Sequence, residues 1–486
     1  MTVNNPKTLS IPFVVIVLVV FLGINITEGR GTLLLGGLAG VAYIVVILKQ
    51  PLIHFFFLVL ASVSFFGYLN PQEHLHLPGF FKIDDIMLCL VGLLFCLKVY
   101  ESGCQLNYKN LESSSEGKKY LYAILILTLV QLIITSFKYS LPIISSVKTG
   151  RVYLYFFIAI WLLQNFKSEK HITAIVRFIL ILGVLQSILA ILQYLFPGHS
   201  FLGYTKVMQL NVGADHVTRV YAPAAYYVNA SFILSFWLLY FKNYRFFSRN
   251  ILVMIAAICC CSMILSFQRT TWVLAILSVL LPLVVLNIEQ IFRYLFAGIY
   301  VIGIVFVFLN LWNPDLIDKM GTRALSIYTE TVNYEGNFAV RFEENTKRID
   351  VIKSNIIFGP GFVHPDYAPY IFGFHEVEGR RASLQTNDSG ILTLLSAFGL
   401  IGVFWVLGIL KLVYKRAKIA LKGNDKNMAL KVGVASFVWS TWLTSLTTTG
   451  FTFSRGIIVF AVFMFLTDAL EEDRQIILDK KKETVC

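Results

Sequence analysis

The chain has 486 residues, of which 57% are hydrophobic and only 14% are charged. A soluble globular domain carries about 25% charged residues, so this composition excludes an ordinary soluble protein and predicts a polytopic membrane protein. The formal net charge of +13 would suggest a nucleic-acid partner in a soluble protein. Here the basic residues cluster in short loops on alternate sides of the apolar runs, and the positive-inside bias explains them without nucleic acid.

Apolar runs of roughly 20 residues, enough to cross a bilayer, recur along the chain. We predict an all-α fold with about fourteen transmembrane helices and one large outer loop. The first run follows a single Lys and lacks a small-residue cleavage site, so we interpret it as a span rather than a signal peptide. The predicted spans are residues 9–26, 31–48, 51–69, 83–100, 119–137, 151–166, 173–196, 220–241, 251–267, 271–288, 294–312, 389–410, 432–449 and 456–470.

The basic loops fix the predicted orientation. An N-terminus on the inside puts the loops 98–119, 167–171, 242–250 and 411–431 on the cytoplasmic face. The chain then divides into eleven helices in residues 1–312, an outer loop in residues 313–388, and three helices with a cytoplasmic tail in residues 389–486. The outer loop has eleven acidic and eight basic residues, so it does not resemble a basic cytoplasmic loop.

Arg269 is the only charged residue between Ile251 and Ile288. A charge at the bilayer centre is costly and usually functional. These 38 residues are long enough for two helices. We therefore predict that Arg269 marks the turn between them, and the orientation above places this turn on the outer face.

In the outer loop, Arg341, Asn345 and Arg348 recur at i, i+4 and i+7, so a helix would place them on one face. Two aligned guanidinium groups suit an anion with several oxygens, such as a diphosphate. Alternatively, Arg348 pairs with Glu344 on a solvated helix. The glycines of the following "FGPGF" stretch permit a tight turn or a close backbone approach to a ligand, which makes them candidate binding residues. They are Gly359 and Gly361.

Two residues near the end of the loop are candidates for acid–base chemistry. Asp388 precedes an apolar helix, where it would act as an N-cap or as a general base that takes a proton from an incoming hydroxyl. His375 is a candidate base or sugar contact, although loop histidines are more often surface residues. Spacing alone does not choose between these roles.

Together these motifs resemble the O-antigen ligase and O-antigen polymerase superfamily. The resemblance covers roughly residues 210–410: "RVYAPAAYYVNASFIL" from Arg219, Arg269 at the head of a span, a large loop with Arg341, the glycine turn, and "NDSGILTLLSAFGLIG". It implies a bacterial inner-membrane glycosyltransferase of the GT-C type. Such an enzyme works on the periplasmic side, without a metal or another cofactor, and inverts the sugar configuration.

The resemblance also implies the substrates and the residue roles. The donor is a glycan on undecaprenyl pyrophosphate, and the acceptor is a glycan or a lipid-linked molecule. Membrane lipid and other polysaccharide assembly proteins are further candidate partners. Arg269 and Arg341, with Arg219 as a further candidate, would hold the pyrophosphate. The ligases have a His as base where this sequence has Asp388, and this departure favours a polymerase of surface polysaccharide over a ligase to lipid A-core.

A transporter is the competing class of protein. A lipid-linked oligosaccharide flippase also has about fourteen spans, and some relatives have been proposed as small-anion transporters. Many transporters show internal repeats and helices broken at mid-membrane. We find no clear repeat in this sequence, and the 76-residue outer loop favours an enzyme.

Overall fold

The structure is a computed structural model that describes residues 51–63, 83–101, 116–196, 207–212, 215–220, 224–280, 336–373, 389–422, 425–446 and 454–483, with scattered single residues elsewhere. It divides into two units, described separately below. Unit 1 comprises Met1–Ser62 and Phe81–Ser113, and unit 2 comprises Val63–Phe80 and Ser114–Cys486.

Unit 1 contains two apolar helices that pack on each other, α3 (Pro51–Ser62) and α5 (Ile83–Glu101). His54 of α3 is fully buried. Its ring nitrogens lie 2.6 Å from the Tyr43 hydroxyl and 3.0 Å from the Met87 carbonyl. A buried imidazole needs such partners, so the Met87 contact also ties α3 to α5.

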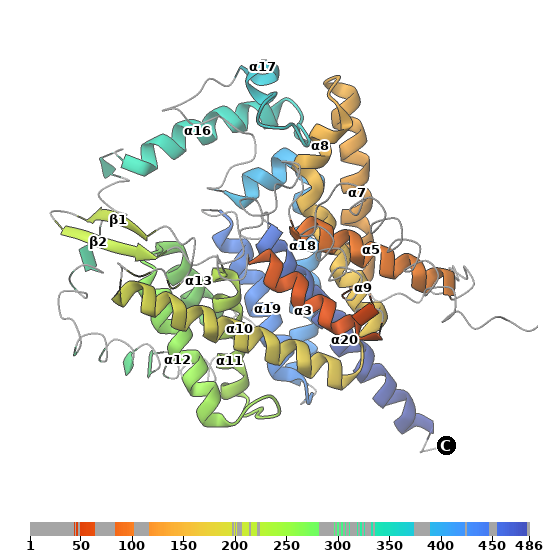
Figure 1. Ribbon diagram of the computed structural model, residues 1–486, viewed down its shortest axis with the longest axis vertical. Helices are drawn as coiled ribbons and strands as arrows, with labels where there is room; N and C mark the ends of the chain where they lie inside the picture. Colours follow the sequence, from red (N-terminus) through yellow and green to blue (C-terminus); the bar gives the residue numbers. More distant parts are fainter. Residues whose placement is uncertain are drawn as a thin grey trace, which may run out of the picture. The chain divides into compact units, whose positions relative to one another are not determined.

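Unit 2 is a bundle of helices with one short hairpin. Its helices are α7 (Glu116–Lys138), α8 (Ile143–Gly150), η2 (Arg151–Phe156), α9 (Phe157–Asn165), α10 (Glu169–Leu195), α11 (Ala225–Tyr240), α12 (Arg249–Leu265), α13 (Arg269–Leu280), α16 (Gly336–Lys353), α17 (Ala368–Phe372), α18 (Gly390–Lys422), α19 (Met428–Thr444) and α20 (Ser454–Glu483). Figure 1 shows α16 and α17 at one end of this unit and the last turns of α20 at the opposite end.

The core of unit 2 is formed by helices that are apolar on all sides. Such helices are normally buried, because no face of them suits water. Every residue of α11 from Tyr227 to Leu238 is buried, and so is every residue of α20 from Gly456 to Leu470. The similarly buried α19 packs against α11, α13, α18 and α20. The predicted spans 220–241, 432–449 and 456–470 thus match central helices.

Outer helices of unit 2 turn apolar side chains away from the protein. On α10, Ile181, Leu185 and Ile188 are 48%, 47% and 40% exposed. They recur at i, i+4 and i+7, so they form one stripe along the helix. On α7, Phe137 is 82% exposed. Stripes of this kind suit contact with lipid, where exposed apolar area carries no hydrophobic penalty.

Four helical segments are long and apolar enough to cross a membrane: Glu116–Lys138, Ile143–Asn165, Glu169–Leu195 and Gly390–Lys422. They match four of the predicted spans, although the second begins at Ile143 rather than at residue 151. The described residues also include five shorter apolar helices. A helical architecture with four helices able to cross a membrane is therefore confirmed in the described part of the chain. The total of fourteen spans stays a prediction, and the spans 9–26 and 294–312 fall largely or wholly outside the described residues.

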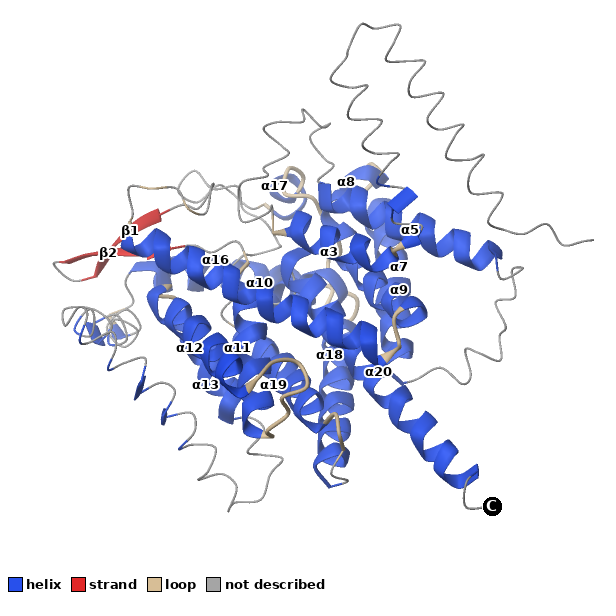
Figure 2. Ribbon diagram, turned by 60° about the horizontal axis from the view of Figure 1, so that its bottom comes forward, coloured by secondary structure: helices blue, strands red, loops and turns tan. Residues whose placement is uncertain are grey.

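A two-stranded antiparallel hairpin departs from the all-α expectation. Strand β1 (Val207–Val212) pairs with β2 (Asp215–Val220), with Val207 opposite Val220 and Val212 opposite Asp215. Figure 2 shows the hairpin at the edge of unit 2, and β2 contacts α10. The sequence alternates apolar and polar residues over 208–212, which favours a strand rather than a helix.

Candidate functional site

The turn between α12 and α13 carries Arg269 and is tightly built. Arg269 is the first residue of α13 and is partly exposed, so the predicted position of Arg269 in a turn is confirmed. The Ser266 hydroxyl donates to the Met263 carbonyl at 2.7 Å and accepts from the Gln268 N–H at 3.2 Å. The Gln268 carbonyl accepts the first backbone hydrogen bond of α13, from Thr271 at 2.9 Å. These bonds fix the direction in which α13 begins.

Phe267, at the centre of this turn, has a left-handed backbone with φ of +51°. That conformation costs a bulky L-residue about 1–2 kcal/mol. The ring offsets the cost by packing, because Phe267 is 1% exposed and contacts two other rings. Its centroid is 6.4 Å from that of Tyr194 and 6.3 Å from that of Trp272. Strained residues held by their surroundings concentrate at functional sites, so this turn is a candidate site.

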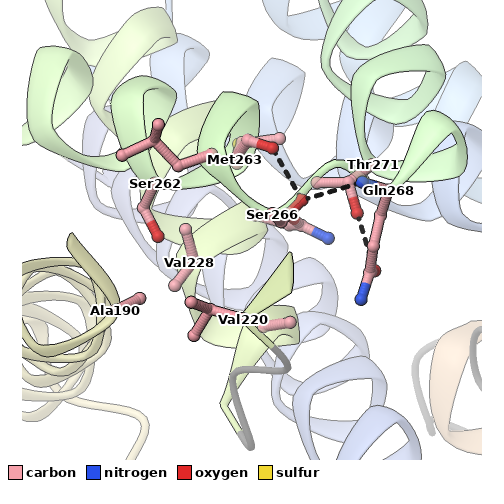
Figure 3. Close-up of a pocket in the computed structure, with 11 residues that line it drawn as sticks. Ala190, Val220, Val228, Ser262, Met263, Ser266, Gln268 and Thr271 are labelled. Atoms are coloured by element: carbon pink, nitrogen blue, oxygen red, sulfur yellow. Dashed lines mark hydrogen bonds between the residues drawn. The ribbon is translucent and has the colours of Figure 1, made fainter. Parts of the chain in front are cut away.

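A small pocket lies beside the turn (Figure 3). Its cavity volume is about 20 Å³, which is room for about one water-sized group. No charged side chain is among its lining residues, whose polar members come from α11, α12, α13 and the turn before α13. The lining residues are Ala190, Val220, Ala225, Val228, Asn229, Ser262, Met263, Leu265, Ser266, Gln268 and Thr271.

Among the described residues that line the pocket, one buried polar atom lacks a hydrogen-bond partner. It does not belong to Thr271, whose hydroxyl donates to Gln268 Oε1 at 3.1 Å. Asn229 is only 6% exposed, and its Oδ1 accepts no hydrogen bond in the part of the chain that the structure describes. A buried acceptor without a donor costs free energy, which marks Asn229 as a binding candidate.

In the predicted outer loop, α16 confirms the helix expected from the spacing of Arg341, Asn345 and Arg348. Arg348 is 7% exposed and its Nη1 donates to Asn345 Oδ1 at 3.0 Å. This burial differs from the solvated position that the Glu344 alternative predicted. The side chains of Arg341 and Glu344 lie outside the described part, so a pyrophosphate-binding role for Arg341 stays a prediction.

The glycine turn after α16 inserts into a break in α18. Helix α18 is interrupted at Gly399, where φ is 60° and ψ is −151°. The Leu400 N–H, which lacks a normal helical partner at the break, donates to the Ile356 carbonyl at 2.9 Å. In return, Gly361 N–H donates to the freed Ser396 carbonyl at 2.8 Å. The turn therefore replaces hydrogen bonds that α18 has lost.

Gly359 and Gly361 thus approach protein backbone rather than a vacant site. Both have positive φ, +74° and +96°. Gly359 N–H donates to the Asn355 carbonyl at 2.7 Å, and Gly361 packs against Thr135 of α7. Because both N–H groups are already donated, the geometry favours the tight-turn alternative, and substrate binding by these glycines stays a prediction.

The remaining predicted residues are only partly described. Arg219 lies in β2 opposite Met208, but its side chain is outside the described part. His375 and Asp388 are also outside the described residues. The sequence interpretation gave no role to Asn229 or Gln268. Their signal was polarity within long apolar runs, which often marks function in membrane proteins.

The fold defines a helical membrane protein, with Arg269 at the start of α13 and Arg348 buried in α16. Residues 252–407, about a third of the chain, match a family model described as O-Antigen ligase. The resemblance to the O-antigen ligase superfamily is therefore confirmed over that stretch. It begins in α12, ends in α18, and includes Arg269, Arg341 and Asp388, whereas Arg219 precedes it. No curated protein matches the chain.

This match supports a membrane glycosyltransferase of the O-antigen ligase and polymerase type. Lipid-linked glycans are the class of substrate that this family implies. The choice between polymerase and ligase, and the role of each residue, are finer questions that the match does not address.

Proposed function

We propose that the protein polymerises oligosaccharide repeats carried on undecaprenyl pyrophosphate into a surface polysaccharide. The observation that carries the proposal is the family match, because one matched stretch contains Arg269, the helix α16 with Arg341, and the approach to α18 with Asp388. The site would lie on the periplasmic side of the inner membrane, in accordance with the predicted orientation.

Under this proposal, an acceptor hydroxyl attacks the anomeric carbon of the donor sugar while lipid pyrophosphate departs. The leaving group gathers negative charge, which the fixed guanidinium groups of Arg269 and Arg341 stabilise in a partly dry site. Asp388 takes the proton of the attacking hydroxyl, an assistance worth about 10²–10⁴-fold in rate. A single displacement inverts the configuration, because a retaining route would need a covalent nucleophile. Arg219, Arg348 and His375 are further candidates for substrate contacts.

The test supplies purified protein with a polyprenyl-pyrophosphate-linked repeat unit and separates the products on a gel. A ladder of lengthening chains is expected. Asp388→Asn should lower the rate about 10²–10⁴-fold, because it removes the base. Arg269→Ala and Arg341→Ala should abolish transfer, whereas Lys353→Ala, an exposed basic residue on the same helix as Arg341, should keep full activity. Full activity in the Arg341 and Asp388 variants would overturn the site assignment.

Ligation is the second candidate, because the matched family model is itself described as O-Antigen ligase. A ligase would transfer its glycan once to a separate acceptor, such as lipid A-core. In the same assay, a single product that requires an added acceptor, with no ladder, would favour this function.

A further inference from the structure

Asn229, which lines the pocket beside the α12–α13 turn, carries a hydrogen-bond acceptor that no described protein group uses. This acceptor is Asn229 Oδ1, and the residue is only 6% exposed. Gln186 lies on α10, one helical turn before the pocket residue Ala190. It is fully buried, and both of its side-chain amide atoms also lack a partner among the described residues. The helices around this pocket therefore hold more hydrogen-bonding capacity than the described protein groups satisfy.

The chemistry of the pocket selects the kind of group that would enter it. A phosphate oxygen accepts hydrogen bonds and cannot satisfy Asn229 Oδ1, whereas a hydroxyl or an amide N–H can. None of the described lining residues is a cation that would attract an anion, and Val220, Val228 and Leu265 supply apolar walls. A volume of about 20 Å³ admits one small substituent rather than a sugar ring.

The position of the pocket relates it to the proposed pyrophosphate clamp. Arg269 lies in sequence between Gln268 and Thr271, which both line the pocket. Along a helix, residues two apart are separated by about 3 Å of rise, although their side chains point to different sides. If Arg269 holds the pyrophosphate, the first sugar of the donor is the part of the glycan nearest to this end of α13.

We infer that this pocket receives one hydroxyl group of the sugar next to the pyrophosphate. Asn229 accepts the hydrogen bond and thereby determines which first sugar the protein takes. This inference rests on the proposed function. A site that hydrogen-bonds a hydroxyl or N–H rejects an analogue that lacks it, because its own polar group is then left unpaired.

The experiment measures the binding of two probes to the full-length protein in lipid nanodiscs. One probe is polyprenyl pyrophosphate, and the other is the same lipid carrying an oligosaccharide. Asn229→Ala should weaken binding of the glycan-bearing probe about tenfold and leave binding of the bare pyrophosphate unchanged. The matched control is Ser235→Ala on the same helix, because Ser235 is buried, bonds to the Phe232 carbonyl at 2.9 Å and does not line the pocket. It should leave the binding of both probes unchanged.

The ratio of the two dissociation constants is measured within one preparation, so a loss of folded protein does not alter it. A second measurement compares two glycan probes whose first sugars differ only in the presence of one hydroxyl group. Wild-type protein should discriminate between them, and Asn229→Ala should not. An unchanged ratio in Asn229→Ala overturns the inference alone. Wild-type protein that binds neither pyrophosphate probe better than free polyprenol overturns both this inference and the proposed function.

Discussion

At the scale of single residues, a buried ion pair ties three helices together. Arg416 of α18 and Asp468 of α20 are 2.6 Å apart, with side chains 9% and 0% exposed. Gly117 of α7 packs directly on this carboxylate, where any added Cβ would collide with it. A buried pair contributes little net stability, but the removal of one partner leaves an uncompensated charge.

Arg416→Ala should therefore destabilise the protein strongly, by about 3–5 kcal/mol. The double variant Arg416→Met with Asp468→Leu should recover most of the loss, because it leaves no buried charge. The melting temperatures of the variants in detergent are compared by heating samples and measuring the remaining folded protein by size-exclusion chromatography. The neighbouring Lys415→Ala is the control, because Lys415 pairs with Glu116 at 3.5 Å on an exposed surface, where ion pairs matter little. A melting temperature for Arg416→Ala equal to wild type would contradict this account.

At the scale of elements, the break in α18 couples the predicted outer loop to the bundle. The loop residues Ile356 and Gly361 exchange backbone hydrogen bonds with α18, and Gln131 of α7 donates to the Phe358 carbonyl at 3.1 Å. Phe362 packs with Tyr153 and Phe398, with ring centroids 5.6 and 5.4 Å away. In a membrane, irregular backbone survives only where protein or water satisfies it. The loop is thus part of the fold, and α16 rests on a fixed support.

Gly399→Ala should break this coupling. Its φ and ψ are accessible essentially only to glycine, and a Cβ there would collide with the Ile357 carbonyl oxygen. Gly373→Ala is the matched comparison, because Gly373 has φ of +66° but no atom within 4 Å of the added Cβ. It should cost only the backbone strain, about 1–2 kcal/mol. The melting temperature should fall clearly further for Gly399→Ala, and equal losses would show that the junction does not hold the loop.

Sequence patterns predicted individual elements well but not their tertiary contacts. The period of Arg341, Asn345 and Arg348 indicated α16, and the lone charge at Arg269 located the start of α13. Hydropathy could not reveal the break at Gly399, because this apolar run contains several glycines and glycine is frequent in ordinary transmembrane helices. The partner of that break lies about 40 residues earlier, and only folding brings the two together. The burial of Asn229 in the pocket depends on packing between α10, α11 and α12 in the same way.

At the scale of the whole molecule, loops predicted on one face of the membrane meet in the structure. Glu169 pairs with Arg245 at 2.8 Å and with Lys426 at 3.3 Å. These residues come from three separate basic connections that the predicted orientation assigns to the cytoplasm. Contacts between these three connections are expected if all three lie on the same side of the membrane. Which side is cytoplasmic follows from the positive-inside bias and stays a prediction.

Thiol labelling tests the predicted orientation. In a chain without its seven native cysteines, Tyr370→Cys should react with a membrane-impermeant maleimide in intact spheroplasts, because Tyr370 is 88% exposed and belongs to the predicted outer loop. Lys415→Cys, at a position 59% exposed in a predicted inner loop, should react only after the membrane is permeabilised. The reverse pattern would put Arg269 and the α16 arginines in the cytoplasm. A glycan polymerase working on the outer face would then be excluded, because its pyrophosphate clamp and its substrate would lie on opposite sides of the bilayer.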